Sequence, residues 1–275
     1  MRTQALTRAM IIMRHEIAFP MYDLHRPDTV ALIRALAELL AARGIAVNAL
    51  WPQEALLSHW RHDALLLSQT CGFPLVTQLP DVQTVGCFHY SAPGCDGFHY
   101  RSLLVAREEN ALQTLADFRG CVVACNAEDS QSGYNALRKM VAPLAQGGRF
   151  FSAVVLSGSH RQSLAALGQR RADIAAIDCV SWALLQRHEP ELLAGLTVIG
   201  STPLAPGLPL ITAKQTSAYT LANLQDALHE LVSHPRYQAV CDALLITGFS
   251  PVTREAYSPL LAWRDEAAAL GVTHL

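Results

Sequence analysis

The sequence of 275 residues has few charges, no strongly basic stretch and no apolar run long enough to cross a bilayer. Only 16% of its residues are charged, and the formal net charge is -2. These absences weigh against nucleic acid as a partner and against direct membrane insertion. A small anionic ligand remains compatible with the composition, because a few local hydrogen-bond donors suffice to hold one.

Three common signatures of enzymes are also missing: the Walker-type phosphate loop, the glycine fingerprint of dinucleotide-binding folds and the nucleophile elbow of hydrolases. Serines at the start of a helix are poor nucleophiles unless a base lies behind them. We therefore expect a binding protein rather than an enzyme, with no cofactor and no catalytic residue.

The sequence contains cysteines, but their pattern does not predict a disulfide framework. The seven cysteines are odd in number and scattered, which predicts buried reduced thiols rather than a set of disulfides. One group has metal-binding residue types: Cys87, His89, Cys95 and His99. Its spacing matches no standard zinc arrangement, so we predict no metal site.

The first residues of the chain do not have the pattern of a secretory signal, because the apolar stretch is short and is broken by Thr7 and Arg8. As encoded, the chain is expected to be cytoplasmic. A periplasmic location is expected if a leader is missing from this chain.

Apolar residues make up 51% of the sequence, which allows a well-buried core. Strand-like stretches alternate with helical ones, which predicts an α/β fold in which mostly parallel sheets are flanked by helices. The length suffices for two lobes. We expect a discontinuous lobe 1 at 13–106 plus 208–275 and a lobe 2 at 107–207, with Ser102–Arg107 and Leu208–Thr212 crossing between them.

The most informative stretch, Cys121–Arg138, is predicted to form a strand, a polar loop and the start of a helix. Ser130, Ser132 and Gly133 lie at this helix start, where unpaired N–H groups and the helix dipole attract anions. One serine would be explained by ordinary N-capping. Two serines and a glycine exceed what a cap needs, which favours oxyanion binding.

Two further polar residues, His160 and Asp178, follow predicted strands of the same block. Ligands of open parallel sheets collect at the carboxyl ends of strands, so these side chains should converge on the serine loop. An ionised Asp178 would repel a bound dianion. Either the ligand carries a cationic amine, or it donates a hydrogen bond from a protonated oxygen, or Asp178 only caps the following helix.

The order and spacing of several segments resemble the phosphate- and phosphonate-binding proteins of ABC transporters, which have the type 2 periplasmic-binding-protein fold. The resemblance covers nearly the whole chain from about Ile17 onward. It is carried by Phe19–Asp23, Ser68–Gly72, Tyr90–Gly97 with Tyr100–Ser102, Asp129–Tyr134, Ser157–His160, Ala172–Asp178, Pro206–Pro209, and Leu245–Phe249 followed by Tyr257.

The resemblance implies two lobes that close on a small phosphate- or phosphonate-containing ligand, and an ABC permease as partner. It implies that the phosphonate group is held by Ser130, Ser132, Tyr22 and His160, with Asp178 as a nearby carboxylate. Gln131 stands where many relatives carry a hydroxyl residue, so its amide would alter the size of the ligand or add a contact. The full set of expected ligand-binding residues is Tyr22, Thr70, Tyr90, Ser130, Gln131, Ser132, Gly133, His160 and Asp178.

Two alternatives remain open from the sequence. The first is a cytoplasmic enzyme on the same fold, since fold does not determine function. The second is a cytoplasmic sensor that reports ligand occupancy to a partner protein through an exposed apolar patch.

Overall fold

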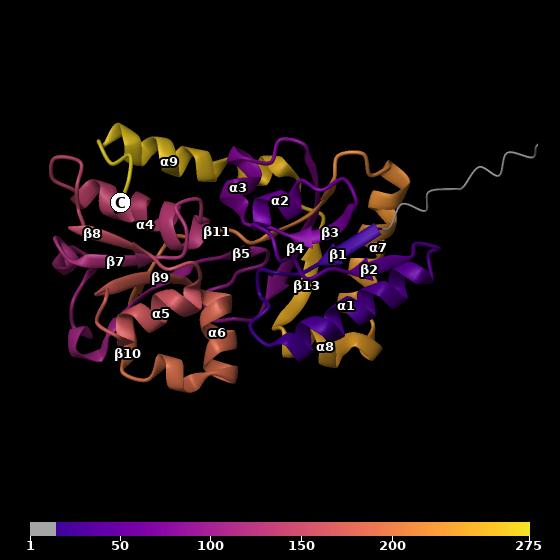
Figure 1. Cartoon of the computed structure of the whole chain (residues 1–275), viewed down its shortest axis with the longest axis horizontal. Helices are drawn as coiled ribbons and strands as arrows, with labels where there is room; N and C mark the ends of the chain where they lie inside the picture. The colour runs from indigo at the N-terminus through magenta and orange to yellow at the C-terminus, as the bar shows by residue number, and fades with distance from the viewer. Residues whose placement is uncertain (1–14) are drawn as a thin grey trace, which may run out of the picture.

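The computed structural model describes residues 15–275, which form two α/β lobes beside one another (Figure 1). The N-terminal stretch that was assessed for a secretory signal lies outside the described residues. The six-stranded sheet of the first lobe has the order β13–β4–β12–β3–β1–β2. Its strands are β1 His15–Ala18, β2 Val47–Ala49, β3 Leu65–Gln69, β4 Val82–Tyr90, β12 Pro209–Ala213 and β13 Ile246–Ser250.

The second lobe contains a five-stranded sheet with the order β10–β6–β9–β7–β8. Its strands are β6 Ser102–Arg107, β7 Val122–Cys125, β8 Ala153–Leu156, β9 Ile174–Asp178 and β10 Leu196–Ser201. Both sheets have a parallel part, β2–β1–β3 in one and β9–β7–β8 in the other. The remaining strand pairs are antiparallel. The predicted α/β architecture is therefore confirmed, but both sheets are mixed rather than mostly parallel, because β6 and β12 each enter their sheet antiparallel to a strand of the parallel part.

The chain crosses between the sheets at two short strands, β5 His99–Tyr100 and β11 Ala205–Pro206, which pair with each other. The sequence had placed the crossings at 102–107 and 208–212. That placement is wrong, because β6 lies wholly in the second sheet and β12 in the first. Both are apolar strands paired on two sides, whereas the crossing strands are too short to extend either sheet.

Helices cover both faces of the first sheet: α1 Arg26–Ala41, α7 Ala218–Ser233 and α8 Gln238–Ala243 pack into one core, and α2 Leu56–Trp60 and α3 Gly72–Thr77 into another. In α1, Leu32, Leu36 and Leu40 repeat at helical spacing and are buried. The helix begins at Arg26, before the predicted cap at Asp28 or Thr29. Pro27 explains the difference, because proline is well suited to a first helical turn.

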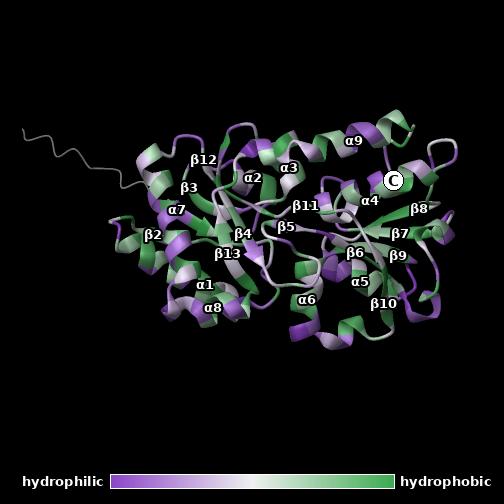
Figure 2. Cartoon of the chain, turned by 180° about the vertical axis from the view of Figure 1, so that it is seen from behind, coloured by the Kyte–Doolittle hydropathy of each residue, from purple (hydrophilic) through white to green (hydrophobic). Residues whose placement is uncertain are grey.

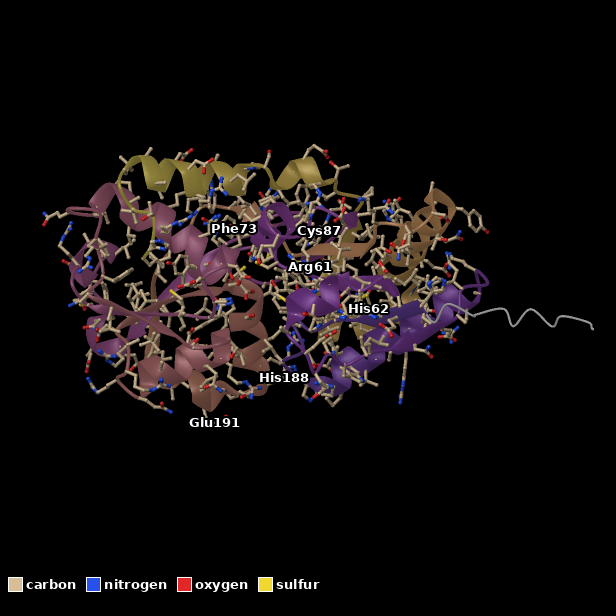
Figure 3. All side chains as sticks on the ribbon, turned by 45° about the horizontal axis from the view of Figure 1, so that its top comes forward. Arg61, His62, Phe73, Cys87, His188 and Glu191 are labelled. Carbon is tan, nitrogen blue, oxygen red and sulfur yellow. The ribbon has the colours of Figure 1, made fainter. Side chains whose placement is uncertain are left out.

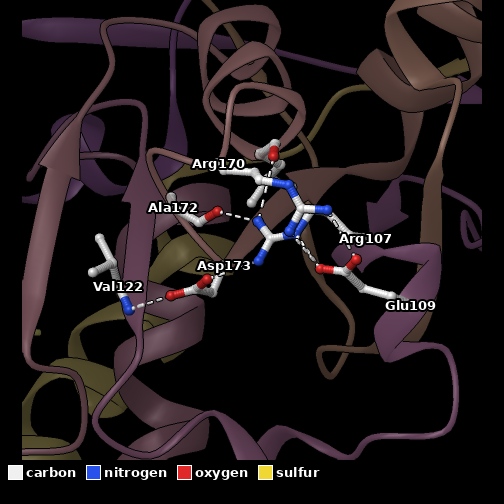
Figure 4. A network of polar contacts seen from close by, with 7 residues as sticks. Arg107, Glu109, Val122, Arg170, Ala172 and Asp173 are labelled. Atoms are coloured by element: carbon white, nitrogen blue, oxygen red, sulfur yellow. Dashed lines mark hydrogen bonds and ion pairs between the residues drawn. The ribbon is translucent and has the colours of Figure 1, made fainter.

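The second sheet packs against α4 Ala136–Val141, α5 His160–Gly168 and α6 Cys179–His188. Figure 2 shows the largely hydrophobic strands inside the more polar helices. At the end of β6, Arg107 donates to Asp173 and to the Ala172 carbonyl, while Asp173 accepts from the Val122 backbone N–H (Figure 4). This network joins the ends of three strands.

One further helix, α9 Pro259–Ala269, runs along both lobes (Figure 1). Leu260 and Trp263 belong to the core that contains α3, while Ala267 packs with Ala142 beside α4. Short helical turns complete the fold at Glu108–Asn110, Leu115–Phe118, Gln131–Asn135, Ala142–Leu144, Pro190–Leu193, Pro235–Tyr237 and Arg254–Tyr257.

Candidate functional site

A cleft of about 650 Å³ lies where loops from the two lobes face each other. From the first lobe it is lined by the segment after β1, which includes Tyr22. From the second lobe it is lined by the loops after β7 and β8 and by the end of β9, which contribute Ser130, Ser132, His160 and Asp178. Together with Tyr22, five of the predicted residues therefore lie at one place.

Ser130 is the N-cap of the turn that leads into α4. Its Oγ accepts a hydrogen bond of 3.0 Å from the Gly133 backbone N–H. The hydroxyl hydrogen of Ser130 is still free to donate, since capping uses only an oxygen lone pair. Capping and ligand contact are therefore compatible at this residue.

Ser132, His160 and Asp178 form a contiguous polar group at the cleft. The Ser132 Oγ lies 2.9 Å from His160 Nε2, and the same nitrogen lies 3.2 Å from Asp178 Oδ2. Burial lowers the pKa of His160, and the nearby Asp178 only partly opposes this. The ring is therefore neutral at pH 7, with its Nδ1 buried and lacking a hydrogen-bond partner.

The arrangement differs from a hydrolytic triad. In a triad, serine and aspartate contact opposite ring nitrogens, so that the aspartate orients the base that activates the serine. Here Ser132 and Asp178 both contact Nε2 of His160. The geometry suits ligand contact better than activation of a nucleophile.

Asp178 caps a helix and also faces the cleft. Its Oδ1 accepts a hydrogen bond of 2.8 Å from the Ser181 backbone N–H and so caps α6. Its Oδ2 faces His160 at the cleft. The carboxylate is held by the helix that it caps, which fixes its direction toward the cleft.

Of the two predicted tyrosines of the first lobe, Tyr22 lines the cleft and Tyr90 does not. Tyr22 lines the cleft, and its pKa is raised mainly by burial and further by Asp178, which keeps the phenol protonated and able to donate. Tyr90 packs edge-on against Tyr22 at 5.3 Å between ring centroids and accepts a hydrogen bond from Gln69. It lines a separate cavity of about 20 Å³ behind Tyr22.

Three other predicted residues lie near the cleft without lining it. The Gln131 side chain is fully buried and accepts a hydrogen bond from Asn135, so it points into the protein. Gly133 lies so close to Asn126 that a Cβ at this position would be 1.9 Å from the Asn126 Oδ1. Thr70 is fully buried at the end of β3, and its N–H bonds to the Pro209 carbonyl.

Sequence reasoning missed several polar residues of the cleft, among them Asn126 and Asp129. Asn126 directly follows β7, and its buried Oδ1 has no hydrogen-bond partner in the protein. Its position at the carboxyl end of a strand was the available signal. Asp129 accepts a hydrogen bond of 2.9 Å from Gln78, which joins the two lobes.

The charges along the cleft are unusual for an anion site. Its lining contains three carboxylates, from Asp23, Asp129 and Asp178, but one guanidinium, from Arg161. Arg161 is itself paired with Glu189, and Asp23 is paired with Arg26. Neutral donors, rather than cations, must therefore supply most of the contacts to an oxyanion.

Cys87, His89, Cys95 and His99 do not form a group within metal-binding distance of one another. Cys87 contacts backbone carbonyls, and His89 Nε2 lies 2.8 Å from the Ser250 hydroxyl. Within residues 15–275, a different trio has ligand atoms in proximity: His25, Asp28 and His188.

The trio connects the lobes, since His25 and Asp28 lie at the start of α1. His188 lies at the end of α6 in the other lobe (Figure 3). The two imidazole rings are stacked at 4.2 Å with only 9° between their planes. A single ion cannot lie in both ring planes of such a stack. Both histidines contact the carboxylate of Asp28. The geometry therefore fits a contact between the lobes rather than a metal centre.

Comparison with known families identifies the chain. Residues 87–257 match the family model described as "ABC transporter, phosphonate, periplasmic substrate-binding protein". The chain belongs to this family. Its members are substrate-binding proteins of the periplasm, so the predicted family resemblance and solute-binding role are confirmed. No helix within residues 15–275 has the length and apolar character needed to span a membrane. A search of curated proteins found no match.

Solved structures show the same fold at low sequence identity. A binding-protein component of an ABC phosphonate transporter from Pseudomonas aeruginosa matches with a TM-score of 0.77 and 18% identity, covering 93% of this chain and 87% of that chain. PhnD1 from Prochlorococcus marinus, in complex with methylphosphonate, matches with a TM-score of 0.76 and 13% identity, covering 93% and 98%. A histidine kinase sensor domain with similarity to periplasmic binding proteins reaches 0.56 at 17% identity, covering 86% and 97%.

Proposed function

We propose that this protein binds a small phosphonate in the cleft between its lobes and delivers it to an ABC permease. The observation that carries the proposal is the convergence of Ser132, His160 and Asp178 at the cleft, within a chain of the phosphonate-binding family. In the bound state, Ser130 and Ser132 donate hydroxyl hydrogens to the phosphonate oxygens. Tyr22 donates from the opposite lobe.

The ligand that fits this cleft best carries a cationic amine beside its phosphonate. A bare dianion would face the carboxylates of Asp129 and Asp178. The other two charges of the lining are already paired, Asp23 with Arg26 and Arg161 with Glu189. An amine near Asp178 replaces this repulsion with attraction, while the neutral donors hold the phosphonate. A protonated phosphate oxygen facing Asp178 is the alternative, and it predicts tight binding of phosphate as well.

Closure of the cleft follows from the placement of these groups. The hinge is proposed at the crossing strands β5 and β11. The lobe boundaries expected from the sequence at 106/107 and 207/208 therefore move to 99–100 and 205–206, because β6 belongs to the second sheet. A ligand that touches Tyr22 on one side and Ser132 on the other stabilises the closed form selectively. Recognition of the closed form by the permease then couples binding to uptake.

Calorimetric titration of the purified protein tests the proposal with aminoethylphosphonate, methylphosphonate and phosphate, and with malate as a control without phosphorus. Tight binding of aminoethylphosphonate, weaker binding of methylphosphonate and no binding of malate are expected. Equal affinity for phosphate would favour the protonated-oxygen alternative. Binding of malate without binding of any phosphorus compound would refute the proposal.

A further inference from the structure

Two cysteines lie in contact at the border between the lobes. The Sγ atoms of Cys95 and Cys179 are 3.5 Å apart. Cys95 lies in the loop between β4 and the crossing strand β5, and Cys179 is the first residue of α6. All seven cysteines lie within the described residues, and no other pair of them shows a sulfur–sulfur contact of this kind.

The backbone on both sides holds this pair together. The Cys179 N–H donates to the Arg101 carbonyl beside the crossing strand. Gly94 allows the loop to approach α6 closely, because a Cβ at this glycine would be 3.2 Å from the Cβ of Cys179. The contact is therefore set by the path of the main chain, and little movement is needed to bring the sulfurs to bonding distance.

We propose that Cys95 and Cys179 are a disulfide-forming pair that ties the crossing loop to α6 in an oxidising compartment. The periplasm, where members of this family reside, is such a compartment. The inference rests on the contact between the two sulfurs and is independent of which ligand the cleft binds.

The reaction needs an exogenous disulfide as oxidant, and oxidised glutathione serves as the simplest example. The Cys95 thiolate attacks one sulfur of the oxidant, which forms a mixed disulfide and releases one glutathione thiolate. The Cys179 thiolate then attacks the Cys95 sulfur and releases the second. The two protons of the cysteine thiols end on the two released glutathiones, which have gained two electrons.

The exposure of the two sulfurs supports this order of attack. Cys95 is partly exposed and accessible to an oxidant, whereas Cys179 is buried. The contact between the sulfurs lowers the pKa of Cys179 and raises that of Cys95, although burial and Asp178 oppose the effect on Cys179. The raised pKa of Cys95 slows the first attack and the lowered pKa of Cys179 favours the second, so access to the oxidant, rather than thiol acidity, places Cys95 first.

Oxidation of the purified full chain with glutathione disulfide provides the test, with no phosphonate present. The denatured protein should lose two of its seven titratable thiols, and reduction with dithiothreitol should restore them. Digestion with trypsin and chymotrypsin separates Cys95 from Cys87, because Tyr90 lies between them and Phe98 follows. Mass spectrometry should then identify a peptide pair linked through Cys95 and Cys179.

The crosslink should also raise the melting temperature. It closes a loop between residues 84 apart in sequence, which restricts the unfolded chain, so a rise of about 5 °C or more is expected. Cys95→Ser should abolish the rise, while Cys121→Ser, at another partly exposed cysteine, should retain it. Seven free thiols after oxidation of the unmodified chain, or a crosslink between other cysteines, would overturn the proposal.

Discussion

Replacement of Ser132 by alanine tests the proposed oxyanion contact most directly. The hydroxyl lies at the cleft, 2.9 Å from His160 Nε2, and the backbone of the residue is held separately by Ser102, which donates to the Ser132 carbonyl at 2.9 Å. The substitution should therefore remove the hydroxyl without moving the loop. His160 retains Asp178 as a neighbour.

The expected loss of affinity follows from the charge of the ligand. A hydrogen bond to a charged group contributes about 1.5–3 kcal/mol, so Ser132→Ala should raise Kd by roughly tenfold to a hundredfold. The effect on folding should be smaller, because only one hydroxyl contact to a neutral ring is lost. We expect a change of about 1 kcal/mol, or about 2–4 °C in Tm.

Titration calorimetry with a phosphonate measures the first quantity, and thermal unfolding without ligand measures the second. Ser233→Ala is the matched control, because its hydroxyl bonds only to the His229 carbonyl on an exposed part of α7. This variant should bind as tightly as the parent. If Ser132→Ala folds normally and its Kd is unchanged, the Ser132 hydroxyl does not touch the ligand and the proposed oxyanion cradle is wrong.

Three other predictions concern the same cleft. Asp178→Asn should keep the helix cap, because an amide oxygen can still accept the hydrogen bond. Calorimetry should show binding of aminoethylphosphonate weakened about tenfold and binding of methylphosphonate strengthened. If both ligands lose affinity equally, the negative charge of Asp178 does not select for an amine. Because burial lowers the pKa of His160 below 6.5, the folded state resists its protonation, so stability is lost as pH falls below about 6.5. Melting curves from about pH 5 to pH 8 should show a smaller acid loss for His160→Gln than for the parent, and identical slopes would contradict the assignment. His188→Ala removes the stack with His25 between the lobes, a contact worth about 0.5–1.5 kcal/mol. Stopped-flow measurements should show that ligand dissociates roughly twofold to tenfold faster from this variant. His62→Ala, at an exposed histidine, is the control, and an unchanged dissociation rate for His188→Ala would show that the stack does not hold the cleft closed.

The predicted convergence at the cleft came from a simple rule about parallel strands. Ser132, His160 and Asp178 each follow a strand whose apolar sequence was recognisable, and parallel neighbours place their carboxyl ends at one edge. The direction of a single side chain is not set by this rule. Gln131 is adjacent to Ser132 in sequence, yet its amide bonds to Asn135 inside the protein.

Other features depended on tertiary packing that local sequence does not encode. The strand β13 was not predicted, because Ile246–Ser250 is short and contains a glycine. It forms because β4 offers an unpaired edge. The contact between His25 and His188 likewise joins two helices from different lobes, and neither helix carries a signal for the other.

The segment that follows helix α9 supports the turn Gln131–Asn135, which contains Ser132. Beyond this helix, the Thr273 carbonyl accepts from Arg138, and the Leu275 N–H donates to the Tyr134 hydroxyl 141 residues earlier in the chain. Tyr134 belongs to the same turn as Ser132. Residues outside the lining of the cleft thus support the turn that is proposed to hold the ligand. Under that proposal, variation in this C-terminal segment can change affinity while every residue that lines the cleft stays the same.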